Sequence, residues 1–179
     1  MGKVHKDVLV VGLRGVAGAG KSRLASELAS TLDRGFTMAV VSFAGPIKEG
    51  LKTMGICKGT TPEAYRRHAQ EIGAGMRAQN PNHWTNLFQD KVRWWGDRTM
   101  QVIVADDLRY PNEAALCDLI FRVIPEGFNG ADLGDRADHE SEMWNRLDTT
   151  TGVQIANVLG NSKNAVSAIR RYILGVLNA

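Results

Sequence analysis

Residues 15–22 read Gly-Val-Ala-Gly-Ala-Gly-Lys-Ser, which fits the pattern G-x-x-x-x-G-K-[S/T] in full. The apolar run at residues 8–13 predicts a buried parallel strand before this loop, and residues 23–32 have leucines at the spacing of one helix face. A glycine loop between a strand and a helix lets backbone N–H groups turn inward around an anion, and the helix N-terminus adds the positive end of its dipole. A chance glycine-rich turn explains these neighbours less well. The pattern therefore predicts a site for a nucleoside triphosphate.

The side chains at the end of this loop have the chemistry that bound phosphates need. Lys21 would reach the β- and γ-phosphates of ATP, and the Ser22 hydroxyl would bind Mg²⁺. Asn157, at the end of the last predicted strand, could hydrogen-bond to the adenine. The residues expected to bind ATP are Gly15, Val16, Ala17, Gly18, Ala19, Gly20, Lys21, Ser22 and Asn157.

The composition is that of an ordinary globular domain. The chain has 179 residues, of which 44% are hydrophobic and 23% charged, so a single domain with a substantial core is expected. A net charge of +3 suits polyanionic small substrates and is too weak to indicate nucleic acid. No apolar run approaches the roughly 18 residues of a membrane span, and the start of the chain leaves no room for a signal peptide. We therefore expect a cytoplasmic protein whose partners are small molecules, with a homodimer left open.

Predicted strands and helices alternate along the whole chain. Such alternation predicts an α/β fold of three layers, α/β/α, around a mostly parallel five-stranded sheet, as in P-loop NTPases. Ligands of such a sheet bind at the carboxyl ends of its strands. Besides the first strand and helix, we expect strands at residues 37–43, 100–105, 119–124 and 153–157, and helices at residues 46–54, 61–76, 83–95, 111–117 and 164–177.

Asp106 and Asp107 follow the apolar residues 102–105, and an acidic end to a buried strand is the Walker B arrangement. A carboxylate there would emerge at the same sheet edge as the glycine loop and could bind Mg²⁺ directly or through water. Periodicity leaves open which of the two faces the metal, and both could instead cap the following helix. Arg109 would add a cation near the transferred phosphoryl group.

A third cluster, between the second and third predicted strands, is rich in arginine. On a helix, Arg66 and Gln70 lie four residues apart and share a face. Gly73 and Gly75 are expected to weaken this helix near its end and to leave Arg77 at the edge of a loop. Arginine suits phosphate because its guanidinium is planar, permanently charged and bidentate. A solvated basic helix face is the alternative interpretation.

These segments occur together, in the same order, in one enzyme family. The sequence resembles the bacteriophage deoxynucleoside monophosphate kinases, a branch of the P-loop nucleoside monophosphate kinases. The resemblance spans about residues 8–157. The matching segments are residues 15–22; residues 43–48, Phe-Ala-Gly-Pro-Ile-Lys; residues 66–84, with Arg66, Arg67, Gln70, Gly73, Arg77 and Trp84; residues 107–113, Asp-Leu-Arg-Tyr-Pro-Asn-Glu; and residues 139–142, His-Glu-Ser-Glu.

The resemblance implies transfer of the γ-phosphoryl group of ATP to a deoxynucleoside monophosphate, with Mg²⁺ as cofactor, in the host cytoplasm if a phage encodes the chain. It also implies a helical acceptor-binding region at about residues 44–99 of the single domain. The glycine-rich, charged residues at about 126–145 would form a closing lid, or else a solvated loop. The residues expected to bind the substrate are Phe43, Lys48, Arg66, Arg67, Gln70, Arg77, Trp84, Asp107, Arg109, His139 and Glu140.

Physical reasoning assigns roles under this hypothesis. Phosphoryl transfer between two anions needs positioning and charge neutralisation more than it needs a base. The candidate catalytic residues are Lys21, which would serve the donor, and Arg109 and Arg136, which would stabilise charge on the group in flight. The arginines of the third cluster would hold the acceptor phosphate. Phe43 and Trp84 could each stack on the acceptor base or pack in the core.

Other functions of a phosphate-binding loop stay open. The nearest is a different small-molecule kinase, acting on a coenzyme precursor or a sugar acid, and a further one is a P-loop ATPase that is not a kinase. A GTPase switch is disfavoured because the chain has no N-K-x-D signature, and its acidic strand continues as Asp-Asp-Leu-Arg rather than D-x-x-G. A DNA-packaging motor would be expected to have a longer chain.

Overall fold

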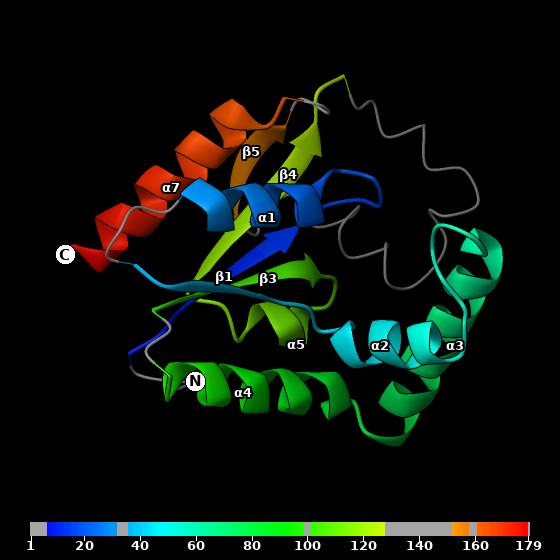
Figure 1. Cartoon of the computed structure of the whole chain (residues 1–179). Helices are drawn as coiled ribbons and strands as arrows, with labels where there is room; N and C mark the ends of the chain where they lie inside the picture. Colours follow the sequence, from blue (N-terminus) through cyan, green and yellow to red (C-terminus); the bar gives the residue numbers. More distant parts are fainter. Residues whose placement is uncertain (1–6, 32–35, 99–100, 128–151, 158–160, 179) are drawn as a thin grey trace.

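The computed structural model of the chain describes residues 7–31, 36–98, 101–127, 152–157 and 161–178. Its strands form one five-stranded sheet in the order β2-β3-β1-β4-β5, and every pair of neighbours is parallel (Figure 1). The predicted α/β class and five-stranded sheet are therefore confirmed. The strands are β1 (Leu9–Arg14), β2 (Met38–Val41), β3 (Val102–Leu108), β4 (Leu119–Pro125) and β5 (Val153–Asn157).

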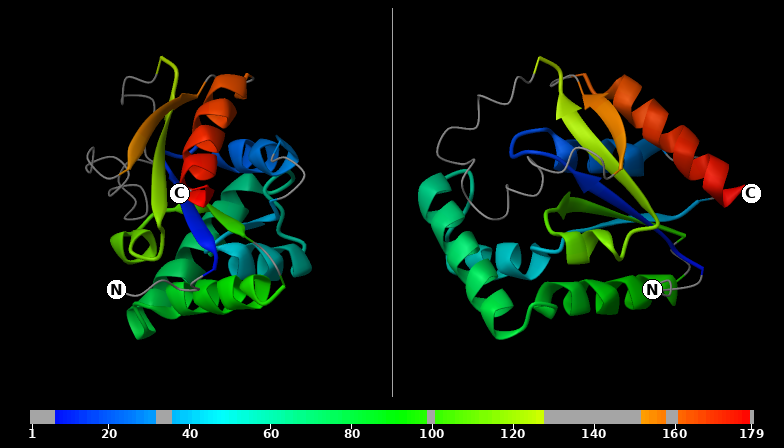
Figure 2. Two further views of the ribbon diagram at one scale, coloured as in Figure 1. Left: turned by 90° about the vertical axis from the view of Figure 1, so that its left-hand side faces the viewer. Right: turned by 180° about the vertical axis from the view of Figure 1, so that it is seen from behind.

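Helices cover both faces of this sheet (Figure 2). On one face, α1 (Lys21–Thr31) and α7 (Lys163–Leu177) bury apolar side chains against β1, β3 and β4. On the other face, α4 (His83–Gly96) and α5 (Pro111–Ala114) do the same. Because the central strands β1 and β3 are covered on both sides, every one of their residues is buried, which explains the apolar runs at residues 9–13 and 102–105.

Two further helices, α2 (Gly45–Thr53) and α3 (Pro62–Gln79), lie beyond the carboxyl ends of the strands (Figure 1). They share an apolar cluster of their own with the first turns of α4, centred on Ile47, Leu51 and Trp84. The expected helical region at residues 44–99 therefore has its own small core beside the core of the sheet.

Three elements end three residues away from the position that the sequence predicted. Strand β3 continues beyond residue 105 through both aspartates to Leu108. Helix α3 continues through its two glycines to Gln79, so that Arg77 lies in its last turn rather than at a loop edge. Helix α5 ends at Ala114 instead of residue 117, because the chain then turns through hydrogen bonds between residues three apart before it enters β4.

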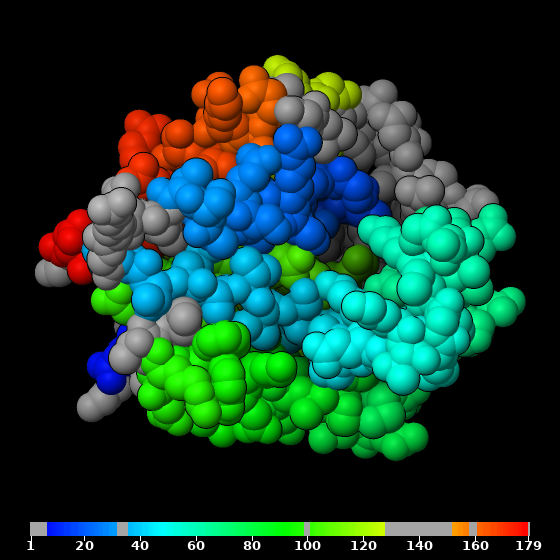
Figure 3. Space-filling model, viewed as in Figure 1, coloured from blue at the N-terminus to red at the C-terminus, as the bar shows by residue number. Residues whose placement is uncertain are grey.

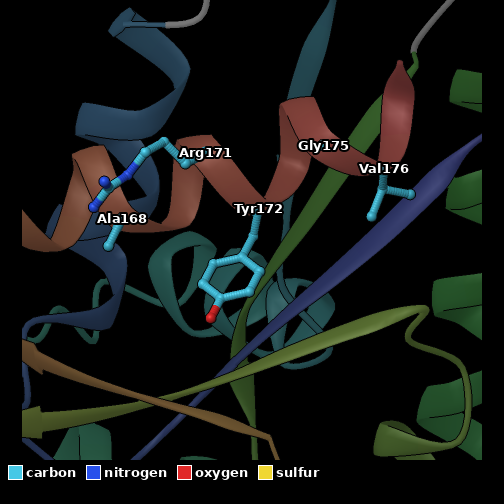
Figure 4. A pocket seen from close by; sticks show the side chains of 5 residues that line it. All are labelled: Ala168, Arg171, Tyr172, Gly175 and Val176. Carbon is cyan, nitrogen blue, oxygen red and sulfur yellow. The ribbon is translucent and has the colours of Figure 1, made fainter. Parts of the chain in front are cut away.

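A hollow lies along one side of helix α7 (Figure 4). This hollow has a volume of about 480 Å³ and lies toward the C-terminal end of α7, at the opposite end of the sheet from the carboxyl ends of the strands (Figure 1). The residues that line the hollow are Ala168, Arg171, Tyr172, Gly175 and Val176.

Among the residues that the structure describes, none of the helices combines the length and apolar character needed to cross a membrane.

Candidate active site

The carboxyl ends of the strands point toward one edge of the sheet, because all five strands are parallel (Figure 1). The loop after β1, the ends of β2 and β3, and helices α2 and α3 meet at this edge. The space-filling view shows the surface hollowed between the blue glycine-loop region and the cyan-to-teal helices α2 and α3 (Figure 3). This edge is where ligands of parallel α/β sheets bind.

The loop between β1 and α1 has a backbone that only glycine adopts readily. Gly15, Gly18 and Gly20 have φ values of +146°, +85° and +82°. At Gly15 the loop also packs directly on a neighbouring strand, since a Cβ there would lie 2.4 Å from the carbonyl oxygen of Val123 in β4. The glycines of the motif therefore set the path of the chain as well as its access to an anion.

Gly15→Ala is expected to lower the free energy of unfolding by about 3 kcal/mol, because the methyl group would force the loop away from β4 in addition to straining its own backbone. Gly18→Ala is the matched control, since Gly18 also has a positive φ but has no heavy atom within 4 Å of an added Cβ. We expect it to cost only about 1 kcal/mol. Urea unfolding of both variants checks this difference. Equal losses would contradict the packing argument.

Lys21 is the first residue of α1, and its side chain turns back onto the loop. Its Nζ atom donates hydrogen bonds to the carbonyl oxygens of Gly15, at 2.6 Å, and Val16, at 2.9 Å. The side chain is buried, although it carries a charge. Two backbone acceptors therefore hold this cation at the N-terminus of α1, the end of a helix that favours anions.

Asn157 supports the same loop from the end of β5. Its Nδ2 donates a 2.9 Å hydrogen bond to the carbonyl oxygen of Ala19. The side chain is buried, and its Oδ1 atom has no hydrogen-bond partner among the described residues. The sequence suggested a contact with adenine for this residue, and the structure adds a structural contact with the glycine loop.

The two aspartates at the end of β3 have different partners. Asp106 accepts a 2.5 Å hydrogen bond from the hydroxyl of Ser42, which follows β2. Asp107 accepts bonds from the backbone N–H groups of Phe43, at 2.8 Å, and Ala44, at 3.1 Å, and its Oδ2 lies 3.2 Å from Lys48 Nζ. Asp107 therefore holds the start of α2 in place, which leaves Asp106 as the aspartate with the simpler set of protein contacts.

The two aspartates lie at an irregularity in the pairing of β3 with β1. Gly12 pairs with Ala105 and Arg14 pairs with Leu108, so β3 has one more residue than β1 over this stretch. Such a β-bulge changes the faces to which side chains point. Ala105 and Leu108 accordingly lie in the same core cluster, although strict alternation would send residues three apart to opposite faces.

The oxygen atoms at this edge suit a magnesium ion that is bound together with a nucleotide. In the described part of the chain, no group of three or more His, Cys, Asp or Glu side chains is arranged to hold a metal. Magnesium usually takes one or two protein carboxylates and completes its shell with phosphate oxygens and water. The Asp106 carboxylate and the exposed Ser22 hydroxyl at the start of α1 have the chemistry of such ligands.

Helix α3 presents its basic residues in two different ways. Arg66 and Arg67 are exposed and Gln70 is half-buried, and the side chains of these three make no hydrogen bond or ion pair with the described residues. Arg77 is engaged within the protein. Its Nη2 lies 3.6 Å from Glu113 Oε1, and its guanidinium stacks 3.8 Å from the ring centroid of Tyr110.

Both aromatic residues that the sequence left between core and base pocket are packed in the core. Trp84 is 5% exposed, and its indole N–H donates a 3.2 Å hydrogen bond to the carbonyl oxygen of Gly73. Phe43 is 3% exposed and stacks on Phe88 with ring centroids 4.0 Å apart. Both rings are almost fully buried, so packing accounts for both residues.

No protein-family model matches this sequence, and no curated protein matches it either. Function is therefore inferred from the motifs and from the geometry of the site.

Arg136, His139 and Glu140 lie outside the described residues, as does the expected lid from residue 128 onward. Arg109 is half-buried, and its backbone N–H is bonded to Glu113.

Three polar residues near the site were not assigned a role from the sequence. The Ser42 hydroxyl donates a hydrogen bond to Asp106 and accepts one of 2.9 Å from Lys48 Nζ. Glu113 was visible only as the last residue of the segment 107–113. Arg14 is fully buried at the carboxyl end of β1, and the signal for it was a charged residue directly after an apolar strand.

Proposed function

We propose that this chain is a P-loop kinase that transfers the γ-phosphoryl group of ATP to a deoxynucleoside monophosphate, giving the diphosphate and ADP. The observation that carries the proposal is that two sets of cationic side chains lie on either side of the edge formed by the carboxyl ends of the strands. Lys21 lies in the glycine loop, and Lys48, Arg66 and Arg67 lie on the helices beyond the strands. A kinase for an anionic acceptor needs both groups, one for each phosphate-bearing substrate.

The chemistry asks the protein mainly for positioning and charge. An oxygen of the acceptor phosphate attacks the γ-phosphorus, and the bond from that phosphorus to the β–γ bridging oxygen breaks, so that the bridging oxygen leaves with ADP. Lys21 would stabilise the donor phosphates, while Mg²⁺ bound with ATP would supply further charge neutralisation, with Asp106 and Ser22 as its protein ligands. Arg109 is our candidate for stabilising charge at the end of β3.

The choice of a deoxynucleotide as acceptor rests on the family resemblance of the five ordered segments. Formation of ADP, measured separately with each deoxynucleoside and ribonucleoside monophosphate, tests it. We expect turnover with at least one deoxynucleoside monophosphate. ATP-dependent phosphorylation of a coenzyme precursor or sugar acid, without turnover of any nucleotide, would contradict the proposal and favour the other small-molecule kinases.

Arg66→Ala is expected to raise the KM for the acceptor roughly tenfold while the KM for ATP changes less than about twofold, because only the acceptor phosphate would lose a bidentate partner. Arg66 is exposed, so the substitution should leave the folded structure intact. Arg171→Ala is the control, since Arg171 is an exposed arginine on α7, far from the carboxyl ends of the strands (Figure 4). Equal changes in both KM values would remove Arg66 from the acceptor site.

A further inference from the structure

Glu113 is a buried carboxylate in α5 that organises the turn after β3. Its Oε2 atom accepts hydrogen bonds from two consecutive backbone N–H groups, those of Arg109 at 2.8 Å and Tyr110 at 3.2 Å. The residue is only 2% exposed. A charged acceptor with two backbone donors fixes the backbone from which the Arg109 side chain emerges.

The other oxygen of Glu113 faces helix α3. It lies 3.6 Å from Nη2 of Arg77, and the same guanidinium stacks on the ring of Tyr110. Gly73, one helical turn earlier, leaves room for this arrangement, because a Cβ at Gly73 would lie 3.3 Å from Arg77 Nη1. The Arg77 guanidinium is therefore fixed in both position and plane by groups of the segment that follows β3.

A second contact joins the same two parts of the protein. The side-chain amide of Asn112 donates a 3.0 Å hydrogen bond to the carbonyl oxygen of Pro81, in the connection from α3 to α4. Residues 109–113 thus hold the end of α3 at two points, one through Glu113 and one through Asn112. This segment connects the strand that bears the two aspartates to the helix that bears the arginines.

We propose that Glu113 is a positioning residue of the kinase, which sets Arg77 and the backbone of Arg109 in one arrangement on the acceptor side of the site. This role rests on the proposed function, because it gives Glu113 a purpose only if an anionic acceptor binds beside α3. Glu113 acts through the two arginines and is buried away from the surface that a substrate would contact.

The charge of Glu113 depends on pH in the neutral range. The pKa of its carboxyl is raised to about 7. Burial raises this pKa most and the charge of Asp107 on β3 adds to the rise, while the backbone hydrogen bonds from Arg109 and Tyr110 and the charge of Arg77 on α3 lower it. Cys117, after α5, stays a neutral thiol near Glu113, since burial raises its pKa to about 12. Because the ionised carboxylate attracts Arg77 most strongly, the hold on Arg77 should tighten as the pH rises through about 7.

Glu113→Gln tests the proposal, because glutamine keeps the size of the side chain and one acceptor oxygen but removes the charge. We expect the KM for the acceptor to rise roughly tenfold at pH 8, with the KM for ATP changed less than about twofold. The acceptor KM of the wild type should fall between pH 6 and pH 8 relative to that of the variant, and below pH 6 the two should converge (roughly one pH unit either side of the Glu113 pKa).

Unfolding measurements separate this role from a merely structural one. The folded-state pKa of Glu113, about 7, lies above the ordinary value of 4.5, so the folded wild type binds more protons than the unfolded chain between these values. The stability of the wild type relative to Glu113→Gln should therefore decrease as the pH rises from about 4.5 to about 7. The variant would then lose acceptor affinity at the pH where its relative stability is greatest.

A double variant completes the test. In an Arg77→Ala background, Glu113→Gln should raise the acceptor KM less than about twofold further, since the partner of the charge is already gone. An unchanged acceptor KM in Glu113→Gln alone, an equal rise in both KM values, or a full tenfold effect in the Arg77→Ala background would overturn the positioning role. Wild-type protein without turnover of any deoxynucleoside monophosphate would instead contradict the proposed function itself.

Discussion

Lys21→Ala is expected to reduce kcat/KM for phosphorylation of a deoxynucleoside monophosphate by at least about 10³-fold, equivalent to about 4 kcal/mol of transition-state stabilisation. The reason is the position of the ammonium group, which is buried and held at the glycine loop by the carbonyl oxygens of Gly15 and Val16. Alanine removes the only charged group of this motif. Steady-state formation of ADP measures the loss.

The buried aliphatic part of Lys21 calls for a second variant. Lys21→Met keeps most of that apolar surface, so its thermal unfolding should resemble that of the wild type while its activity is lost as in Lys21→Ala. Arg171→Ala, at an exposed position of α7, should retain wild-type activity. Substantial turnover in folded Lys21→Met would remove the glycine loop from the reaction.

Asparagine substitutions at the end of β3 should separate a metal ligand from a structural carboxylate. Asp106→Asn is expected to lower kcat by roughly 10²–10³-fold and to change the free energy of unfolding by less than about 1 kcal/mol. Its remaining carbonyl oxygen can still accept the hydrogen bond from Ser42, while the charge that would bind Mg²⁺ is lost.

Asp107→Asn should have the opposite profile. Its carboxylate accepts hydrogen bonds from the buried backbone N–H of Phe43 and from the N–H of Ala44, and the amide group of asparagine can replace only one of these acceptors. We expect a loss of about 2 kcal/mol in the free energy of unfolding, because bonds to a charged acceptor contribute more than neutral ones. The half-exposed Lys48 adds little to this value.

Activity as a function of Mg²⁺ concentration, together with urea unfolding, checks both variants. Asp106→Asn should need a higher Mg²⁺ concentration for half-maximal activity, and Asp107→Asn should show the wild-type value. The reversed result, with a weakened Mg²⁺ response in Asp107→Asn alone, would show that the bulge in β3 orients the two carboxylates in the opposite sense.

Local patterns in the sequence predicted most of the fold. The first strand and helix and the order of the remaining elements follow from hydrophobic periodicity, which reports which face of each element is buried. The predicted end of β3, at residue 105, was wrong for a physical reason. Two consecutive aspartates after apolar residues suggested the end of the strand, but Ser42 and the backbone of Phe43 satisfy their carboxylates, so the strand continues to Leu108.

Helix α3 was misjudged for a related reason. Glycine lowers helix propensity, so Gly73 and Gly75 suggested that the helix ends at about residue 76. In the folded protein, Gly73 packs against Ile47, accepts a hydrogen bond from Trp84 and makes room for Arg77, and these contacts offset the weak propensity. Contacts of this kind join residues that are distant in the sequence, and no local pattern contains them.

The sequence by itself determined the glycine loop, because its backbone conformation depends on residues that adjoin one another and on glycines that tolerate positive φ. It also determined that acidic and basic clusters follow the strands of a parallel sheet. Only the tertiary structure decided which aspartate holds the start of α2, where Arg77 lies and what Glu113 contacts. Those outcomes depend on a bulge and on side-chain pairs between separate elements, and these exist only once β1, β3, α3 and α5 have packed together.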